Sequence, residues 1–319
     1  MKKSVIDWLL EENQPSMRYL ALTELLDRPK NDTQVKSSKR NIPKLGWAKD
    51  ILEKQNKGGY WIDESDLYFP KYISTNWMLL VLSDLGLTRE NPSIERACQL
   101  WIKRFGMKDG GFNDEPRDKV SHLCLTGNTA RALVKFGYAN DPRVIRAFEW
   151  LAKNQRKSGG WDCFLGKGNL DSWEPLSAFA VYPRQKWTRS MKLAVERGAE
   201  FYLERELHKE GRRYAPWYRF HYPVHYYYDL LVGLDFMTAL GYSSDKRLGY
   251  AISLLKKKRR RDGRWNLDEA NPDPESPIAK WDRKHPKEAS IPFALDSPRR
   301  ANKMITLTAL KVLKRIAGS

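Results

Sequence analysis

The stretch RAFEWLAKNQRKSGGWD (Arg146–Asp162) joins the end of an amphipathic helical pattern to a two-glycine turn and a tryptophan. Four other segments repeat part of this order: KQNKGGYW (Lys54–Trp61), GMKDGGF (Gly106–Phe112), HKEGRRY (His208–Tyr214) and RRRDGRW (Arg259–Trp265). The glycines at 58, 110, 159, 211 and 263 follow one another at intervals of 52, 49, 52 and 52 residues. A fixed interval of this size indicates a repeat architecture.

Each glycine turn lies between two helical patterns, and the second pattern is the more apolar of the two. Apolar residues recur every three or four positions, as expected for helices with a buried face. The repeating unit is therefore a helical hairpin of about 50 residues, which must stack on its neighbours to bury its apolar face. The sequence predicts one all-α domain over 1–319, with N-terminal helices in 1–41 and five hairpins in 42–319. We expect the N-terminal helices to dock on the outer wall or to plug one end of the stack, closing an otherwise incomplete barrel.

The opening stretch also carries a specific motif. Arg146-Ala147, Trp150-Leu151, Gln155 and Gly159-Gly160-Trp161 stand in the order of the QW repeat. In this order the chain resembles squalene-hopene and oxidosqualene cyclases, and it is identified as a divergent, single-toroid member of the terpenoid cyclase and protein prenyltransferase β-subunit superfamily. The resemblance implies an α/α toroid, in which the apolar second helices form an inner ring.

Five residues of these repeats are interpreted as scaffold. The tight turn needs glycine, the glutamine amide can satisfy free groups at helix ends, and the tryptophan packs the joint between hairpins. The residues with these structural roles are Gln55, Trp61, Gln155, Trp161 and Trp265.

The resemblance further implies a ligand cavity at the ring centre, near the N-terminal ends of the inner helices. Aromatic and polar side chains there would suit an isoprenoid or another apolar ligand with a reactive or charged head, such as a diphosphate. The candidate ligand-binding residues are Trp77, Asn128, Trp173, Glu174, Tyr228 and Lys303.

Two departures argue against triterpene cyclisation by the squalene cyclase mechanism. The DXDD acid motif of those cyclases does not occur in the sequence. The chain of 319 residues also supplies about one toroid, whereas those cyclases have two.

Protein prenyltransferase β subunits hold zinc through an Asp-X-Cys pair and a distant histidine. This chain offers His122 and Cys124, and further along His225 and Asp229, as candidate catalytic residues. His122, Cys124 and His225 are the candidate zinc ligands, because thiolate and imidazole bind zinc well, and Cys163 is a second candidate thiolate. His225 and Asp229, four apart, are expected on one helix face. The alternative is a buried cysteine acting as a small hydrophobe beside a hydrogen-bonded core histidine.

The net charge of +18 leaves other partners open. The run Lys256–Arg261 could contact nucleic acid or an anionic membrane surface, although such a run is usually a solvated helix end. The Pro-rich segment 267–300 could form a lid, with Arg299, Arg300 and Lys303 facing a diphosphate, or a surface connection of paired charges.

The three cysteines are too scattered for a disulfide framework, and the apolar run at the N-terminus is very short for a signal peptide. The sequence also has no apolar segment of the ~20 residues that a membrane-spanning helix needs. These features predict a cytoplasmic protein, which could touch membranes peripherally. Three classes of function remain open. They are an isoprenoid-handling enzyme of the prenyltransferase or cyclase type, a noncatalytic toroid that binds an apolar ligand, and a basic helical-repeat protein that binds nucleic acid or a protein partner.

Overall fold

The computed structural model describes residues 4–114, 119–162, 166–269, 280, 283–285 and 295–318. Within these residues the chain is helical, and its β-structure amounts to two isolated bridges. No helix among them combines the length and the apolar character needed to cross a membrane.

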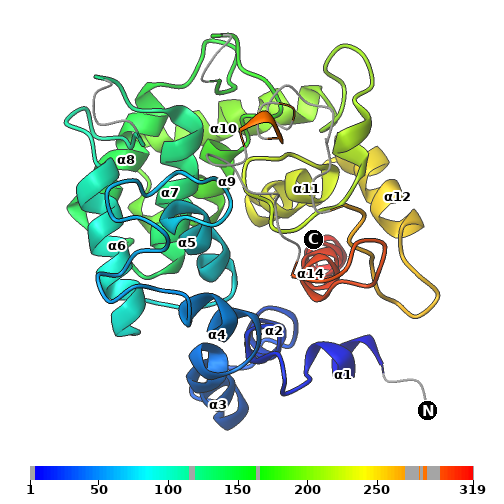
Figure 1. Cartoon of the computed structure of the whole chain (residues 1–319). Coiled ribbons are helices and arrows are strands. Elements are labelled where there is room, and N and C mark those ends of the chain that lie inside the picture. Colours follow the sequence, from blue (N-terminus) through cyan, green and yellow to red (C-terminus); the bar gives the residue numbers. More distant parts are fainter. Residues whose placement is uncertain are drawn as a thin grey trace.

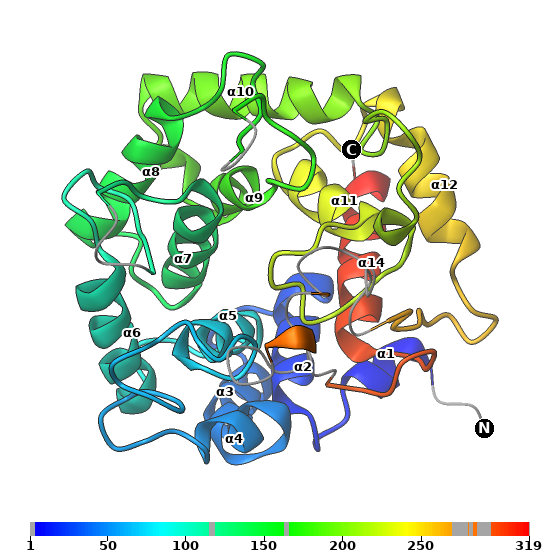
Figure 2. The same ribbon diagram turned by 45° about the horizontal axis from the view of Figure 1, so that its top comes forward.

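Outer and inner helices alternate along the chain (Figures 1 and 2). The outer helices are α4 (Gly46–Leu52), α6 (Pro92–Phe105), α8 (Pro142–Lys153), α10 (Arg189–Glu204) and α12 (Gly249–Lys257). The inner helices are α5 (Thr75–Asp84), α7 (Leu123–Lys135), α9 (Glu174–Val181), α11 (Leu230–Ala239) and α14 (Lys303–Ala317). Each inner helix contacts the next one, so that they surround a common centre. The predicted α/α toroid is confirmed.

The sequence pattern accounts for the two layers. In α8 the buried residues Val144, Ala147, Phe148 and Leu151 lie on one stripe, so one face packs inward and the other meets solvent. In α5 every residue from Thr75 to Ser83 is buried, because an inner helix is covered on most sides.

The turn of the opening stretch links neighbouring hairpins. The Gln155 amide donates to Gly159 O at 2.6 Å and to Ala194 O of α10 at 2.7 Å. The Trp161 indole donates to Leu151 O of α8 at 3.0 Å. The same bonds recur at Gln55 with Gly59 O and Ser93 O, at Trp61 with Ile51 O, and at Trp265 with Leu255 O.

The turn glycines show how the ring closes. Three of them lie with positive φ against the outer helix of the following hairpin: Gly59 on Arg96 of α6, Gly110 on Arg146 of α8, and Gly159 on Arg197 of α10. The last turn glycine, Gly263, lies against Val5 of α1 (Val5–Leu9). The N-terminal helix therefore occupies the next outer position.

The N-terminal segment completes the ring rather than covering it. Helix α2 (Pro15–Leu20) and the π-helix that continues it (Ala21–Leu25) contact α14, and α2 also contacts α4. In Figure 2, α2 lies between α5 and α14. This placement corresponds to the closing role expected for 1–41, and α3 (Thr33–Asn41) packs against α2. Five short 3-10 and π segments complete the described helices: Ala21–Leu25, Ile42–Lys44, Arg184–Lys186, Ala215–Tyr218 and Lys246–Leu248.

Candidate functional site

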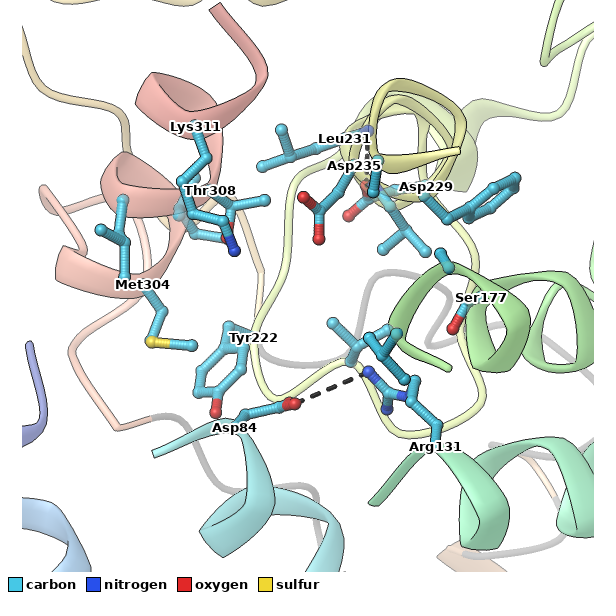
Figure 3. Close-up of a pocket in the computed structure, with 18 of the residues that line it drawn as sticks. Asp84, Arg131, Ser177, Tyr222, Asp229, Leu231, Asp235, Met304, Thr308 and Lys311 are labelled. Atoms are coloured by element: carbon cyan, nitrogen blue, oxygen red, sulfur yellow. Dashed lines mark hydrogen bonds and ion pairs between the residues drawn. The ribbon is translucent and has the colours of Figure 1, made fainter. Parts of the chain in front are cut away.

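A cavity of about 330 Å³ lies at the centre of the inner ring (Figure 3). Its apolar wall comes from α2, α9, α11, α14 and the loop before α11. The apolar lining residues are Leu20, Ala180, Val181, Val224, Leu231, Val232, Phe236, Ala239, Met304, Ile305 and Leu307. Charged lining residues come from α5, α7, α11, α14, the residue before α11 and the π-helix at Ala21–Leu25. The cavity is thus amphipathic, with both apolar and charged lining residues.

The segment from Arg219 to Asp229 fills the part of the ring where the ligand was expected. The His225 ring lies 5.2 Å from the Trp77 ring and 5.3 Å from the Tyr72 ring, measured between centroids. Asn128 donates from Nδ2 to the His225 carbonyl oxygen at 3.0 Å. Two predicted ligand-binding residues, Trp77 and Asn128, therefore hold the chain's own loop and do not line the cavity.

His225 and Asp229 do not share a helix face, so that expectation was wrong. Helix α11 begins at Leu230, and Asp229 is its N-cap, with Oδ1 accepting from the Leu231 and Val232 amides. Pro223 and the positive φ of His225 (48°) are incompatible with an earlier helical start.

Asp229 instead pairs with His221. Its Oδ2 accepts from the His221 amide at 3.1 Å and lies 2.7 Å from His221 Nδ1. Both side chains are almost completely buried, and both residues line the cavity. Four contacts from its own segment therefore satisfy the Asp229 carboxylate.

A first ion-pair group at the cavity centres on Asp84, the last residue of α5. Lys135 Nζ lies 2.6 Å from Asp84 Oδ1, and Arg131 Nη1 lies 3.6 Å from the same oxygen. Burial opposes ionisation of this carboxyl, but the charges of Lys135 and Arg131 outweigh burial and lower its pKa. Asp84 is consequently an anion, and it does not supply an acidic proton.

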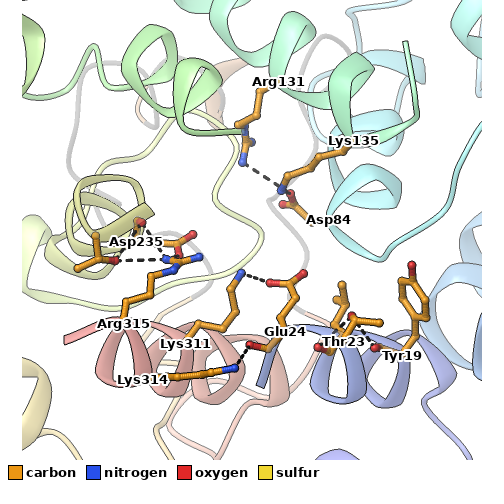
Figure 4. A network of polar contacts seen from close by, with 12 residues as sticks. Tyr19, Thr23, Glu24, Asp84, Arg131, Lys135, Asp235, Lys311, Lys314 and Arg315 are labelled. Atoms are coloured by element: carbon orange, nitrogen blue, oxygen red, sulfur yellow. Dashed lines mark hydrogen bonds and ion pairs between the residues drawn. The ribbon is translucent and has the colours of Figure 1, made fainter. Parts of the chain in front are cut away.

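A second group crosses the ring from α11 to α14 and to the N-terminal segment (Figure 4). Arg315 Nη1 lies 2.8 Å from Asp235 Oδ1, and Lys311 pairs with Glu24 at 2.5 Å. Burial raises the pKa of Asp235, but the charges of Lys311 and Arg315 prevail and lower it to about 2. The carboxylates Asp84 and Asp235 are therefore both matched by cations.

The candidate catalytic and zinc-binding residues do not form a ligand group. His122 is the N-cap of α7, with Nδ1 3.6 Å from Asp114 Oδ1 and its side chain 38% exposed. His225 is buried among aromatic rings, and Cys124 is partly buried. Across the part of the chain that the structure describes, no three His, Cys, Asp or Glu side chains are placed to hold a metal ion. Cys163 lies outside the described residues, so its role as a zinc ligand stays a prediction.

The other predicted ligand-binding residues divide in two. Trp173 lines the cavity, whereas Glu174 is buried beside it without contributing to the lining. The Tyr228 hydroxyl donates to Leu207 O at 2.9 Å. Lys303 donates to Trp8 O at 2.6 Å and pairs with Glu11, because ring closure brings α1 against the start of α14. Tyr228 and Lys303 therefore hold the scaffold.

Most of the predicted lid lies outside the described residues, which omit 270–279, 281–282 and 286–294. At its end, Arg299 is exposed and lies 3.6 Å from Glu269, and neither Arg299 nor Arg300 lines the cavity.

Sequence reasoning missed most of the charged and hydroxyl residues that line the cavity: Glu24, Asp84, Arg131, Lys135, Ser177, Tyr222, Asp235, Thr308, Lys311 and Arg315. A signal was present in two inner helices. Asp84 ends the apolar run of α5, and Asp235 is the one charge in α11. A lone charge in a helix buried on most sides indicates a polar partner at the ring centre.

No protein-family model matches the chain. Among curated proteins it is 27% identical over 170 residues to squalene–hopene cyclase from Zymomonas mobilis subsp. mobilis, a match covering 45% of this chain and 25% of that protein. The chain thus aligns with a quarter of the length of the cyclase.

Two solved structures resemble the chain over nearly all of its length. A protein from Actinoplanes matches with a TM-score of 0.51 and 16% identity, covering 95% of this chain and 90% of that one. A type II terpene cyclase from Scytonema, in complex with geranylgeranyl dihydroxybenzoate, matches with a TM-score of 0.47 and 15% identity, covering 96% and 86%. The partial match to squalene–hopene cyclase, together with the α/α toroid, supports a place in the terpenoid-cyclase-like superfamily.

Proposed function

We propose that the protein binds an isoprenoid or a similar small apolar ligand in the central cavity. The observation that carries the proposal is the cavity itself, enclosed by inner helices with an apolar wall. Apolar, concave sites with a few placed polar groups are the usual form of small-molecule sites. The terpenoid-cyclase-like fold is consistent with an isoprenoid-related role, although fold alone does not determine function.

The size of the cavity limits the ligand. At about 330 Å³ it lies near the lower end of ligand pockets, which span ~300–1,000 Å³. With ~30 Å³ for each water-sized group, it holds roughly ten such groups. A ten-carbon prenyl compound is therefore a ligand of suitable size for this cavity.

The acid–base properties of the cavity favour binding over protonation of an alkene. Protonation needs a carboxylic acid that keeps its proton, whereas Asp84 and Asp235 have lowered pKa values. Asp229 already accepts from four groups of its own segment. We therefore propose ligand binding without acid chemistry by these three carboxyl groups.

Titration of the purified protein with geraniol, followed by calorimetry, tests the proposal. Ala180 of α9 lines the cavity, and Ala180→Phe would place a ring in it. We expect this variant to bind geraniol at least about tenfold more weakly, because the ligand and the ring compete for one volume.

Ala152→Phe is the matched control, since Ala152 is also partly buried but lies on the outer helix α8. It should bind geraniol as the parent does. Unchanged affinity in a folded Ala180→Phe protein, or no binding by the parent protein, would reject the central cavity as the site.

A further inference from the structure

Four polar groups that line the cavity have no hydrogen-bond partner among the residues that the structure describes. They are Trp173 Nε1, Ser177 Oγ, Tyr222 Oη and Arg131 Nε. The exposed fractions of these residues are 1%, 5%, 3% and 8%. Such groups are rare in buried positions because an unpaired donor has lost its water without replacement.

The four groups come from three neighbouring elements. Trp173 and Ser177 stand at the start of α9, Arg131 lies in α7, and Tyr222 belongs to the loop that fills the ring. The Arg131 guanidinium lies 5.3 Å from the centre of the Trp173 ring. In Figure 3, Ser177, Tyr222 and Arg131 all border the pocket, and the Arg131 guanidinium is directed toward Asp84.

All four groups can donate a hydrogen bond. The indole N–H and the guanidinium Nε–H are donors only. Burial raises the pKa of the Tyr222 hydroxyl well above its ordinary value, with a further contribution from the Asp84 charge, so the phenol keeps its proton. A ligand that satisfies this set must present oxygen acceptors.

The charged residues of the cavity argue against a strongly anionic ligand. Lys135, Lys311 and Arg315 each pair with a carboxylate at 2.8 Å or less. A diphosphate would have to displace these carboxylates.

We propose that the cavity selects a neutral apolar ligand with an oxygen acceptor, such as a prenyl alcohol, whose oxygen accepts from up to two of the donors Trp173, Ser177, Tyr222 and Arg131 Nε. The inference rests on the proposed function and specifies its ligand class. The oxygen would lie among the donors beside the loop, and the hydrocarbon would lie along α11 and α14, whose apolar residues form the opposite wall. The ion pairs of Asp84 and Asp235 would remain intact on binding.

Three probes of equal carbon number test the inference: geraniol, the corresponding hydrocarbon 2,6-dimethylocta-2,6-diene, and geranyl diphosphate. Binding to the full chain is measured by calorimetry and by quenching of tryptophan fluorescence. Because one net hydrogen bond changes affinity by about threefold to tenfold, we expect geraniol to bind at least about tenfold more tightly than the hydrocarbon. The diphosphate should bind more weakly than geraniol.

Ser177→Ala and Tyr222→Phe each remove one donor and keep the shape of the cavity. Each should reduce the preference for geraniol over the hydrocarbon by about threefold to tenfold while leaving hydrocarbon affinity unchanged. Ser83→Ala is the matched control, because Ser83 is buried on α5, donates to Leu80 O and does not line the cavity. It should leave the preference as it is in the parent.

The outcomes separate the inference from the proposed function. Equal binding of alcohol and hydrocarbon, or a preference that persists in both donor variants, overturns the donor set but leaves the cavity as a binding site. Tightest binding by the diphosphate overturns the neutral class. If none of the three probes binds, both the inference and the proposed function fail.

Discussion

Lys303 Nζ lies 2.8 Å from Glu11 Oε2, and this contact joins the first residue of the last inner helix to the N-terminal segment. Lys303 also donates to Trp8 O, and its ammonium lies 5.2 Å from the centre of the Trp8 ring. The Lys303 side chain is 7% exposed, so its charge depends on these partners. The ring is therefore closed by a contact between two residues that are 292 positions apart in the sequence.

Removing the Glu11 charge should destabilise the closed ring. Glu11→Gln leaves the Lys303 ammonium buried without its counter-ion, and breaking a buried pair commonly costs about 3–5 kcal/mol. Glu11 is 26% exposed, so we expect a smaller loss of about 1–3 kcal/mol in the free energy of unfolding. Urea denaturation measures this loss.

Glu90→Gln is the control for that change, because the Lys39–Glu90 pair lies on the surface, with the Glu90 side chain 73% exposed. We expect it to change the free energy of unfolding by less than about 0.5 kcal/mol. Equal effects of the two variants would contradict a special role of the Lys303–Glu11 pair in closure.

Gly159 should tolerate a methyl group much less well than Gly211. Both have positive φ, at 92° and 66°. A Cβ at Gly159 would lie 2.5 Å from Arg197 O, whereas a Cβ at Gly211 would meet no atom within 4 Å. Gly211→Ala should therefore cost about 1 kcal/mol for backbone strain alone, and Gly159→Ala roughly 3 kcal/mol or more, because backbone must also move. Thermal unfolding of the two variants, measured in parallel, tests which of them loses more stability. A larger loss for Gly211→Ala than for Gly159→Ala would show that Gly159 does not pack closely against the next hairpin.

The repeat could be predicted from sequence because its turns have local physical requirements. A left-handed turn such as that at Gly159 favours glycine, and a buried tryptophan indole such as that of Trp161 needs a nearby carbonyl. Both residue types therefore recur at a regular interval in the sequence. The position of the N-terminal helices leaves no such pattern. It depends on contacts such as Gly263 with Val5, which join opposite ends of the chain.

The site was harder to predict than the fold for a related reason. The spacing of His225 and Asp229 fits a helix, but Asp229 satisfies the first amides of α11 and so begins the helix after itself. Trp77 was recognised as central, yet the chain's own loop covers it. Which residues face a remaining cavity depends on how a loop folds back into the ring, and helical periodicity contains no information on that.

Neutralising the basic run tests the nucleic-acid alternative. Lys256, Lys257 and Arg261 are exposed at and after the end of α12, whereas Lys258 pairs with Asp268 at 2.7 Å. If the run binds nucleic acid, replacing Lys256, Lys257 and Arg261 by glutamine should weaken duplex binding and reduce the slope of log affinity against log salt by up to about 3. Fluorescence anisotropy at several salt concentrations measures both quantities.

A second triple variant controls for net charge. Lys54, Lys57 and Lys108 are equally exposed but belong to other turns of the ring. Replacing them should have a smaller effect if the run is a defined site. Equal losses in both triple variants would indicate nonspecific attraction, and no loss in either would reject Lys256–Arg261 as a nucleic-acid site.

His225 should make the protein sensitive to mild acid. Burial, with a smaller contribution from the His221 charge, lowers the pKa of His225 from 6.5 to about 3, and the nearby Asp84 and Arg131 charges oppose each other. Between these values the unfolded chain binds a proton that the folded chain does not. The stabilisation is fully present above pH 6.5 and is lost as the pH falls toward 3. By pH 5 the loss relative to neutral pH is about 2 kcal/mol, at ~1.4 kcal/mol for each pH unit.

His225→Phe keeps an aromatic ring among Tyr72 and Trp77 and removes the titrating group. Urea denaturation at pH 7.5, 6 and 5 measures the free energy of unfolding of both proteins. Between pH 7.5 and pH 5 this free energy should fall by about 2 kcal/mol less in the variant than in the parent. His208→Gln, which removes a partly exposed ring stacked on Tyr250, should keep the parent's pH dependence. If His225→Phe and the parent lose the same free energy between pH 7.5 and 5, the buried histidine is not the source of the acid sensitivity.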